Sequence, residues 1–355
     1  DEEGKYPKLT DISYYKKIRE EAADKNSKFT TSVVASNMNF GPVTVVEANF
    51  NNTVSTEINP DFIAENVSYM GDPYKHRLLY QAEARTRTTE MVLYDILGKD
   101  AERNGDFDGV DISSMLTKPS YPNSSDTLKP RVLVAEKVPT EAERDLNNPI
   151  WKEWNYEDES QNGTIDKKKV QAVAFDLRKT KSGQDFTLNK QGILIAYVKM
   201  TATTDRNKEN VQSGNMAYFR AVQYNTNTRP AGAEAETLQA GSLHRLVKPL
   251  VFSLPVKKVL KVPAGLAAPD IQNKFTFTLT GVDGAPLLNE EGKASITELK
   301  NPDSDGGLME FGKIRILKPG KYTYKIAETA GNVAGVSLVN MGEQEISLTV
   351  ENKNN

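Results

Sequence analysis

The stretch KYTYKIAE, Lys321–Glu328, alternates polar and apolar side chains and indicates the fold of the segment around it. In an extended chain, Tyr322, Tyr324 and Ile326 point to one side, because successive side chains of a strand face opposite sides of a sheet. A helix would spread these three residues around its circumference. The alternation therefore predicts a half-buried β-strand, with one face on a core and the other in solvent.

The same period of two occurs before and after this stretch. Phe275, Phe277 and Leu279 alternate with polar residues, and Ile346–Asn352 (ISLTVEN) repeats the pattern. From residue 246 to residue 355, about seven short strands occupy about 110 residues, which is typical of an immunoglobulin-like β-sandwich.

The chain before residue 246 also has the composition of β-structure. Short segments rich in Val, Ile, Tyr, Phe and Thr, such as MVLYDI at Met91–Ile96, are separated by clusters of Asn, Asp, Gly, Pro and Ser. No long amphipathic helical pattern occurs, which disfavours a parallel α/β sheet, since helices must connect its strands. The sequence therefore predicts an all-β protein with tandem β-sandwich domains.

Composition also predicts where the domains begin and end. Residues 1–27 are charged and contain helix formers, so we expect a lead-in segment that is either a short helix or without a core of its own. Residues 225–243 are rich in Ala, Gly, Thr and Asn and are predicted to be a linker. We therefore expect a large adhesin-type β-sandwich over residues 28–245 and a second β-sandwich over residues 246–355.

The composition of the 355 residues excludes several kinds of site. There is no cysteine, which excludes disulfides, thiolate nucleophiles and cysteine-ligated metals. The two histidines, His76 and His244, are far apart in sequence, which argues against a histidine-rich metal site. A net charge of −3 is not typical of a nucleic-acid-binding protein. No apolar stretch reaches the roughly 20 residues of a membrane helix, so we expect neither a nucleic-acid partner nor a membrane span.

Three polar residues fall on strand faces that should be apolar. Lys258 shares a face with Val256 and Leu260, Glu328 continues the apolar face of KYTYKIAE, and Asn352 continues that of ISLTVEN. Each residue alone would be explained by a strand end that reaches solvent. A buried charge, however, is normally paired or neutralised. The three together therefore predict a polar site inside the second sandwich.

The segments that carry these residues, LPVKK, YTYKIAE and LTVEN, resemble the pilin isopeptide-linkage domain of Gram-positive surface proteins, as in the streptococcal major pilin, which has a Cna B-type immunoglobulin-like fold. The resemblance covers roughly residues 248–354. It implies a spontaneous amide between Lys258 as nucleophile and Asn352 as acceptor, with Glu328 as catalytic acid. Burial disfavours the charged amine, and a protonated glutamate would stabilise charge on the acceptor oxygen. Lys257 is the competing lysine, and its opposite parity favours Lys258.

Residues 28–245 resemble modules of large surface adhesins of Firmicutes. Together the two resemblances imply a structural protein displayed on the cell wall or pilus, either an adhesin stalk or a pilin-like subunit. The implied partners are neighbouring pilin or surface subunits, with a sortase acting on the full-length protein. The only reaction expected is the single-turnover formation of the amide, so the chain is not expected to be an enzyme in the ordinary sense.

Two alternative functions remain open from the sequence. In one alternative, the chain is a ligand-binding adhesin whose first sandwich recognises a host extracellular protein or glycan. Trp151 and Trp154 would then line a sugar site. A β-sandwich glycosidase would need a pair of carboxylates flanking its substrate. Acidic residues are plentiful, but no pair is singled out by spacing.

One segment has the beginning of a calcium-binding loop. The sequence NGDFDG starts at Asn104 and places Asp106 and Asp108 at the spacing of an EF-hand-like loop. Met115 stands at the twelfth position, where such loops have glutamate, and Asp111 is the candidate replacement. The alternative is a solvated Asp/Gly loop, and no other cofactor is expected.

Overall fold

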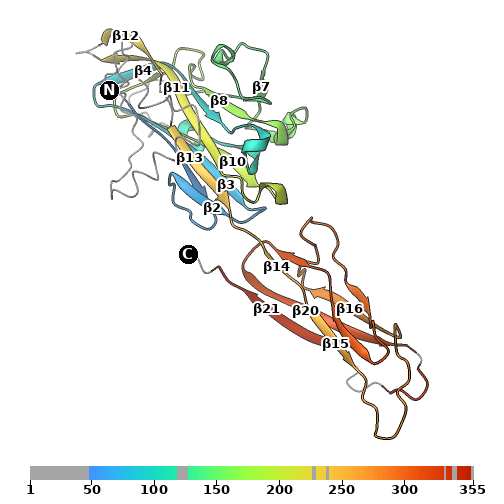
Figure 1. Cartoon of the computed structure of the whole chain (residues 1–355). Helices are drawn as coiled ribbons and strands as arrows, with labels where there is room; N and C mark the ends of the chain where they lie inside the picture. The colour runs from blue at the N-terminus through green and yellow to red at the C-terminus, as the bar shows by residue number, and fades with distance from the viewer. Residues whose placement is uncertain are drawn as a thin grey trace, which may run out of the picture. The chain divides into compact units, whose positions relative to one another are not determined.

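The computed structural model describes residues 48–117, 127–225, 229–236, 240–331, 333–337 and 342–352. Regular structure in these residues consists of β-strands and short 3-10 turns, so the prediction of an all-β protein is confirmed (Figure 1). No helical segment among them has the length and hydrophobicity of a membrane span. The chain forms two compact units, Asp1–Val247 and Lys248–Asn355, and this division falls two residues after the boundary expected from composition. The predicted lead-in, residues 1–27, lies outside the described residues.

The first unit contains two β-sheets. The smaller sheet has the strand order β1-β3-β10-β5, and the larger has the order β2-β13-β11-β4-β8-β6-β7, with β12 beside β11 and β9 beside β4. The strands of this unit are β1 (Ala48–Thr56), β2 (Glu65–Ser68), β3 (Pro73–Ala82), β4 (Thr86–Ile96), β5 (Gly105–Asp111), β6 (Arg131–Ala135), β7 (Trp151–Trp154), β8 (Ala172–Asp176), β9 (Thr187–Leu188), β10 (Ile193–Ala202), β11 (Ser213–Asn225), β12 (Arg229–Glu236) and β13 (Ala240–Leu246).

Aromatic side chains join the two sheets of the first unit. Phe219 on β11 packs edge-on against Phe50 on β1, with ring centroids 5.4 Å apart. It also packs against Tyr80 on β3, at 4.9 Å. All three side chains are buried. Because β11 belongs to one sheet and β1 and β3 to the other, these contacts define the core of a β-sandwich.

The prediction of a linker over residues 225–243 is wrong. Residues 229–236 form β12, which pairs antiparallel with β11, and β13 begins at Ala240. Small side chains let this segment pair closely with its neighbour. At Gly232, whose φ is +79°, an added Cβ would lie only 2.4 Å from the Tyr224 ring. The segment has few large apolar residues, and this composition is typical of loops. The prediction failed because the segment pairs as a strand and packs against the Tyr224 ring.

The second unit contains a four-stranded sheet of order β17-β16-β20-β21 and two two-stranded pairs, β14-β19 and β15-β18. The predicted alternation is confirmed, since Phe275, Phe277 and Leu279 are buried and the residues between them are more exposed. Phe252 on β14 packs against Tyr324 on β20 at 6.1 Å, so the pairs cover one face of the sheet. The strands are β14 (Leu250–Phe252), β15 (Pro255–Val259), β16 (Phe275–Val282), β17 (Glu298–Lys300), β18 (Gly306–Glu310), β19 (Ile314–Ile316), β20 (Gly320–Ala330) and β21 (Gln344–Val350).

Candidate functional site

Lys258 lies on β15 with its side chain turned toward the core of the second unit. Only 13% of the side chain is exposed, and its Nζ lies 4.1 Å from the centre of the Phe275 ring. Lys257, the preceding residue on β15, is exposed. The alternation along β15 therefore selects Lys258 as the inward-facing lysine, as the sequence predicts.

Glu328 meets this lysine from the opposite layer of the sandwich. It lies on β20, where its backbone is paired with Phe277 of β16, and 22% of its side chain is exposed. Lys258 Nζ donates a hydrogen bond to Glu328 Oε1. The structure thus brings together two of the three predicted site residues, an amine and a carboxyl group that are both largely buried beside the Phe275 ring.

Asn352 does not lie at this site, which corrects the prediction that it is the acceptor. β21 is antiparallel to β20, and Val350 is paired with Gly320, eight residues before Glu328 on β20. At about 3.3 Å per residue, eight residues span about 26 Å. Two further residues from Val350 to Asn352 cover at most about 7 Å. Asn352 is therefore about 20 Å or more from Glu328, too far for a covalent bond to Lys258.

The pairing of β21 explains the error. Side-chain parity correctly indicated which face of β21 is buried, but it does not say which strand lies alongside. Consecutive strands joined by a short connection commonly pair with each other in antiparallel fashion, and this rule would have placed the end of β21 beside the beginning of β20. Lys258 instead requires an acceptor on a strand beside β15. One edge of β15 is already paired with β18. Within the described residues, no strand pairs with the other edge.

The candidate calcium loop has an extended backbone, because Gly105–Asp111 form strand β5, which pairs with β10, and Asn104 directly precedes this strand. An EF-hand loop curls around its ion and brings its first, third and fifth positions together. In an extended strand, Asn104 and Asp108 are separated by about 13 Å at about 3.3 Å per residue. In the described part of the chain, no group of three or more His, Cys, Asp or Glu side chains has the geometry of a metal site.

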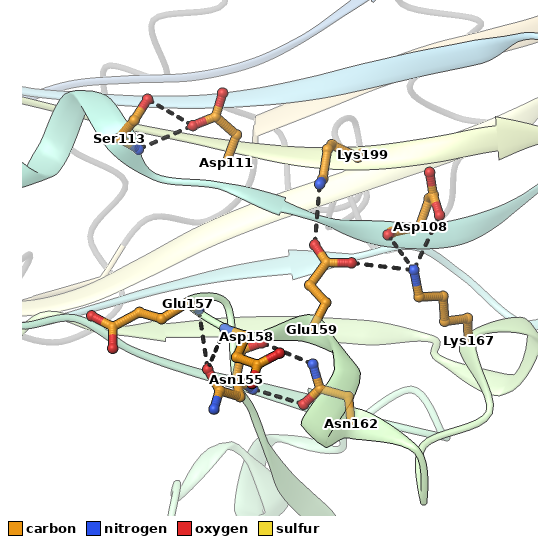
Figure 2. Close-up of polar contacts among 10 residues, drawn as sticks. All are labelled: Asp108, Asp111, Ser113, Asn155, Glu157, Asp158, Glu159, Asn162, Lys167 and Lys199. Atoms are coloured by element: carbon orange, nitrogen blue, oxygen red, sulfur yellow. Dashed lines mark hydrogen bonds and ion pairs between the residues drawn. The ribbon is translucent and has the colours of Figure 1, made fainter.

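The acidic residues of this segment interact separately with other side chains (Figure 2). Lys167 Nζ lies 3.2 Å from Asp108 Oδ1. Asp111 Oδ1 accepts hydrogen bonds from the backbone N–H and the hydroxyl of Ser113, at 3.0 and 2.8 Å. Each carboxylate therefore serves a local surface contact.

The two other candidates of the segment stabilise the interior of the first unit. Asp106 Oδ1 lies 3.6 Å from a guanidinium nitrogen of Arg103, which is almost completely buried. Asn104 is wholly buried, and its Oδ1 lies 2.7 Å from His244 Nδ1. Its Nδ2 donates to the backbone oxygens of Val211 and His244, at 2.9 and 3.0 Å. These contacts give Asp106 and Asn104 a structural role in the first unit.

The tryptophans proposed for a sugar site belong to the core. Trp151 is 7% exposed, and its Nε1 donates to the backbone oxygen of Glu143 at 2.8 Å. Trp154 is 1% exposed and packs edge-on against Phe107 at 5.0 Å. Neither ring presents a face on which a sugar would stack, so the interpretation of these residues as glycan ligands is wrong.

Comparison with family models finds a match for most of the second unit. Residues 254–355 match the family model FctA, described as a Spy0128-like isopeptide containing domain. A comparison with curated protein sequences finds no match.

Three solved structures found by structural comparison are major pilins. A variant of BcpA, the major pilin subunit of Bacillus cereus, has 11% identity and a TM-score of 0.46, over 87% of this chain and 68% of that chain. A C-terminal fragment of GBS80 of Streptococcus agalactiae has 11% identity and a TM-score of 0.30, over 86% and 91%. Two domains of SpaD from Corynebacterium diphtheriae have 15% identity and a TM-score of 0.26, over 84% and 88%.

Proposed function

Because residues 254–355 match the Spy0128-like isopeptide-containing domain, we propose that this chain is a pilin-like structural subunit of a Gram-positive cell surface, whose second unit is closed by an amide bond from Lys258. The observation that carries the proposal is the hydrogen bond from Lys258 Nζ to Glu328 Oε1, formed by two largely buried side chains beside the Phe275 ring. Its partners are neighbouring pilin subunits, and a sortase joins them.

The contact between Lys258 and Glu328 suits a single-turnover acyl transfer. The neutral amine attacks the side-chain carbonyl carbon of an asparagine, and the new carbon–nitrogen bond replaces the bond to the amide nitrogen, which leaves as ammonia. Glu328 accepts a proton from the amine and delivers one to the leaving nitrogen. Its un-ionised form donates a hydrogen bond to the carbonyl oxygen while negative charge develops there. The fixed positions of the groups in the core supply the proximity that an external enzyme would otherwise provide.

The acceptor belongs beside the edge of β15 that does not pair with β18. A side chain carried there by an adjacent strand would lie next to Lys258, since neighbouring strands are about 4.8 Å apart. Asn352 does not meet this requirement. A bond from β15 to such a strand would join the polypeptide across the sandwich, and tension on the chain would then load a covalent bond in a protein that has no cysteine.

The test is peptide mapping of the protein released from the bacterial surface. A protease that cleaves after lysine passes over a lysine whose ε-nitrogen is in an amide. We expect Lys258 in a branched peptide whose mass is lower by one ammonia than the sum of its parts. Glu328→Gln should leave Lys258 unlinked, while Lys257→Ala and Asn352→Ala should keep the link. Recovery of unlinked Lys258 from the folded parent protein would refute the proposal.

A further inference from the structure

A polar cluster lies in the middle of the first unit, between its two sheets. It consists of Asn52 on β1, Asn215 on β11 and Asp95 on β4. Asn52 and Asp95 are 0% exposed and Asn215 is 1% exposed. β1 belongs to the smaller sheet, and β4 and β11 are neighbours in the larger one. The cluster therefore connects the two sheets through side chains.

Asn52 and Asn215 are joined amide to amide. Asn52 Nδ2 donates a hydrogen bond to Asn215 Oδ1. Asn215 Nδ2 in turn donates to the backbone oxygen of Ile96 at 3.3 Å, on the strand of Asp95. Asp95 is paired in register with Ala217, two residues after Asn215. Asn215 and Asp95 are thus diagonal neighbours on one face of adjacent strands, within reach of each other.

The buried surroundings of Asp95 disfavour its charged form. In the described part of the chain, neither of its carboxyl oxygens has a hydrogen-bond partner. Burial raises the pKa of Asp95 from 3.8 to about 7, an increase that the neighbouring Asn215 amide partly opposes. A carboxyl group that keeps its proton next to a carboxamide can donate a hydrogen bond to the carbonyl oxygen.

This arrangement parallels the one around Lys258. In the second unit, a side chain from β15 crosses to the carboxyl of Glu328 on a different sheet. In the first unit, Asn52 crosses to a carboxamide beside the carboxyl of Asp95. Asn215 supplies the carboxamide and Asp95 supplies the acid. The side chain that crosses between the sheets is the amide of Asn52, whereas a coupling reaction would need a primary amine at that position.

We propose that Asn52, Asn215 and Asp95 form a latent amide-forming site between the two sheets, complete except for the amine. The inference rests on the chemistry proposed for Lys258. It assigns Asn215 as the acceptor and Asp95 as the acid that would serve a primary amine carried at position 52. In the native chain the site holds the sheets together by hydrogen bonds alone.

The space between the backbones fits a lysine–asparagine amide. The Cα atoms of Asn52 and Asn215 are now joined through two short side chains and one hydrogen bond. A lysine–asparagine amide would replace that hydrogen bond by two covalent bonds. A hydrogen bond of about 2.9 Å covers about the same length as two bonds of a zigzag chain, so the separation of the strands need not change.

The coupling would balance without any other reactant. The amine nitrogen bonds to Cγ of Asn215, and the bond from Cγ to Nδ2 breaks. One amine proton passes by way of the Asp95 carboxyl to the leaving nitrogen, which departs as ammonia. The products are a secondary amide between β1 and β11 and an unchanged Asp95.

The test is the Asn52→Lys variant, analysed by intact mass and peptide mapping. We expect a mass lower by one ammonia than its sequence requires and a branched peptide that contains positions 52 and 215. Two double variants, N52K with D95N and N52K with N215A, should keep the full mass. Asn52→Met, which adds similar bulk without an amine, is the matched packing control. A folded Asn52→Lys protein without the branched peptide would overturn the proposal.

A second measurement does not depend on the folding of that variant. At about pH 5.5, where solvated carboxyl groups are ionised, the native protein should show the infrared carbonyl band of an un-ionised acid, and Asp95→Asn should remove this band. Absence of the band would also overturn the proposal. The linkage at Lys258 is read in the same digest, so a failure at position 52 alone is distinguished from a failure of the proposed function.

Discussion

Replacing Asp95 by asparagine should change how the stability of the first unit depends on pH. Burial raises the pKa of Asp95 from 3.8 in the unfolded chain to about 7 in the native protein. Below about pH 4 both states hold the proton, and the native state is not penalised. As the pH rises toward 7, the unfolded chain has released a proton that the native state retains, so the free energy of unfolding falls. A difference of about 3 pKa units at about 1.4 kcal/mol each amounts to about 4 kcal/mol.

The assay is urea unfolding followed by tryptophan fluorescence. The chain has two tryptophans, Trp151 and Trp154, and both are buried in the first unit, so their signal follows that unit. Between about pH 4 and about pH 8, the free energy of unfolding of the Asp95→Asn variant should rise relative to the parent by about 4 kcal/mol. Asparagine has nearly the same shape as aspartic acid, so any packing change shifts both ends of the profile equally.

Other titrating groups nearby are shared by the two proteins. Burial lowers the pKa of His76 to about 3 and lowers that of His244 well below its ordinary value. Both histidines therefore reduce stability as the pH falls below about 6.5, which is opposite in sign to the effect of Asp95. Burial raises the pKa of Tyr74, so this residue does not titrate in this range. Parallel profiles of parent and variant would show that Asp95 is ionised in the native protein and would refute the reasoning.

Three further substitutions test the packing. Gly105→Ala should destabilise the first unit by about 1–3 kcal/mol, measured by tryptophan fluorescence in urea, because the added Cβ would lie 2.4 Å from the buried Tyr74 hydroxyl; an unchanged midpoint would contradict this. Phe275→Ala should destabilise the second unit by about 3–5 kcal/mol, measured by hydrogen exchange of its amides, because a side chain that is 1% exposed would leave a cavity. Lys257→Ala, at an exposed position, should change the stability of the second unit by less than about 0.5 kcal/mol in the same experiment.

Side-chain parity made the faces of the strands predictable from the sequence. The alternation in KYTYKIAE and around Phe275 required only that the segments be extended. It also separated Lys258 from Lys257, since adjacent residues of a strand face opposite sides. The contact between Lys258 and Glu328 followed because two polar groups on buried faces of one small core tend to meet.

The position of Asn352 and the strand β12 could not be obtained in the same way. Parity says which side of a sheet a residue occupies, but it carries no information about which strand lies next to it or in what register. β12 has few large apolar residues, so it lacks the periodic signal on which strand prediction depends. Its pairing with β11 is decided by tertiary contacts such as the Tyr224 ring over Gly232.

The buried cluster of the first unit left one signal in the sequence. Asp95 is the single charged residue in MVLYDI, a segment that is otherwise apolar or aromatic. A lone acid in a fully buried strand indicates a residue that is kept neutral or paired. Its neighbours Asn52 and Asn215 are distant in sequence, and only the facing of the two sheets brings them together.

The pairing of β2 with β13 has a consequence for the order in which the first unit folds. These strands are parallel neighbours, and Ser68 Oγ lies 2.8 Å from His244 Nε2 across a separation of 176 residues. Contacts between residues so far apart raise the contact order and slow folding, because a long loop must close before they form. The sheet is not complete until the chain as far as Leu246 is available. Formation of the complete sandwich is therefore postponed until the whole unit is available, from β1 to β13.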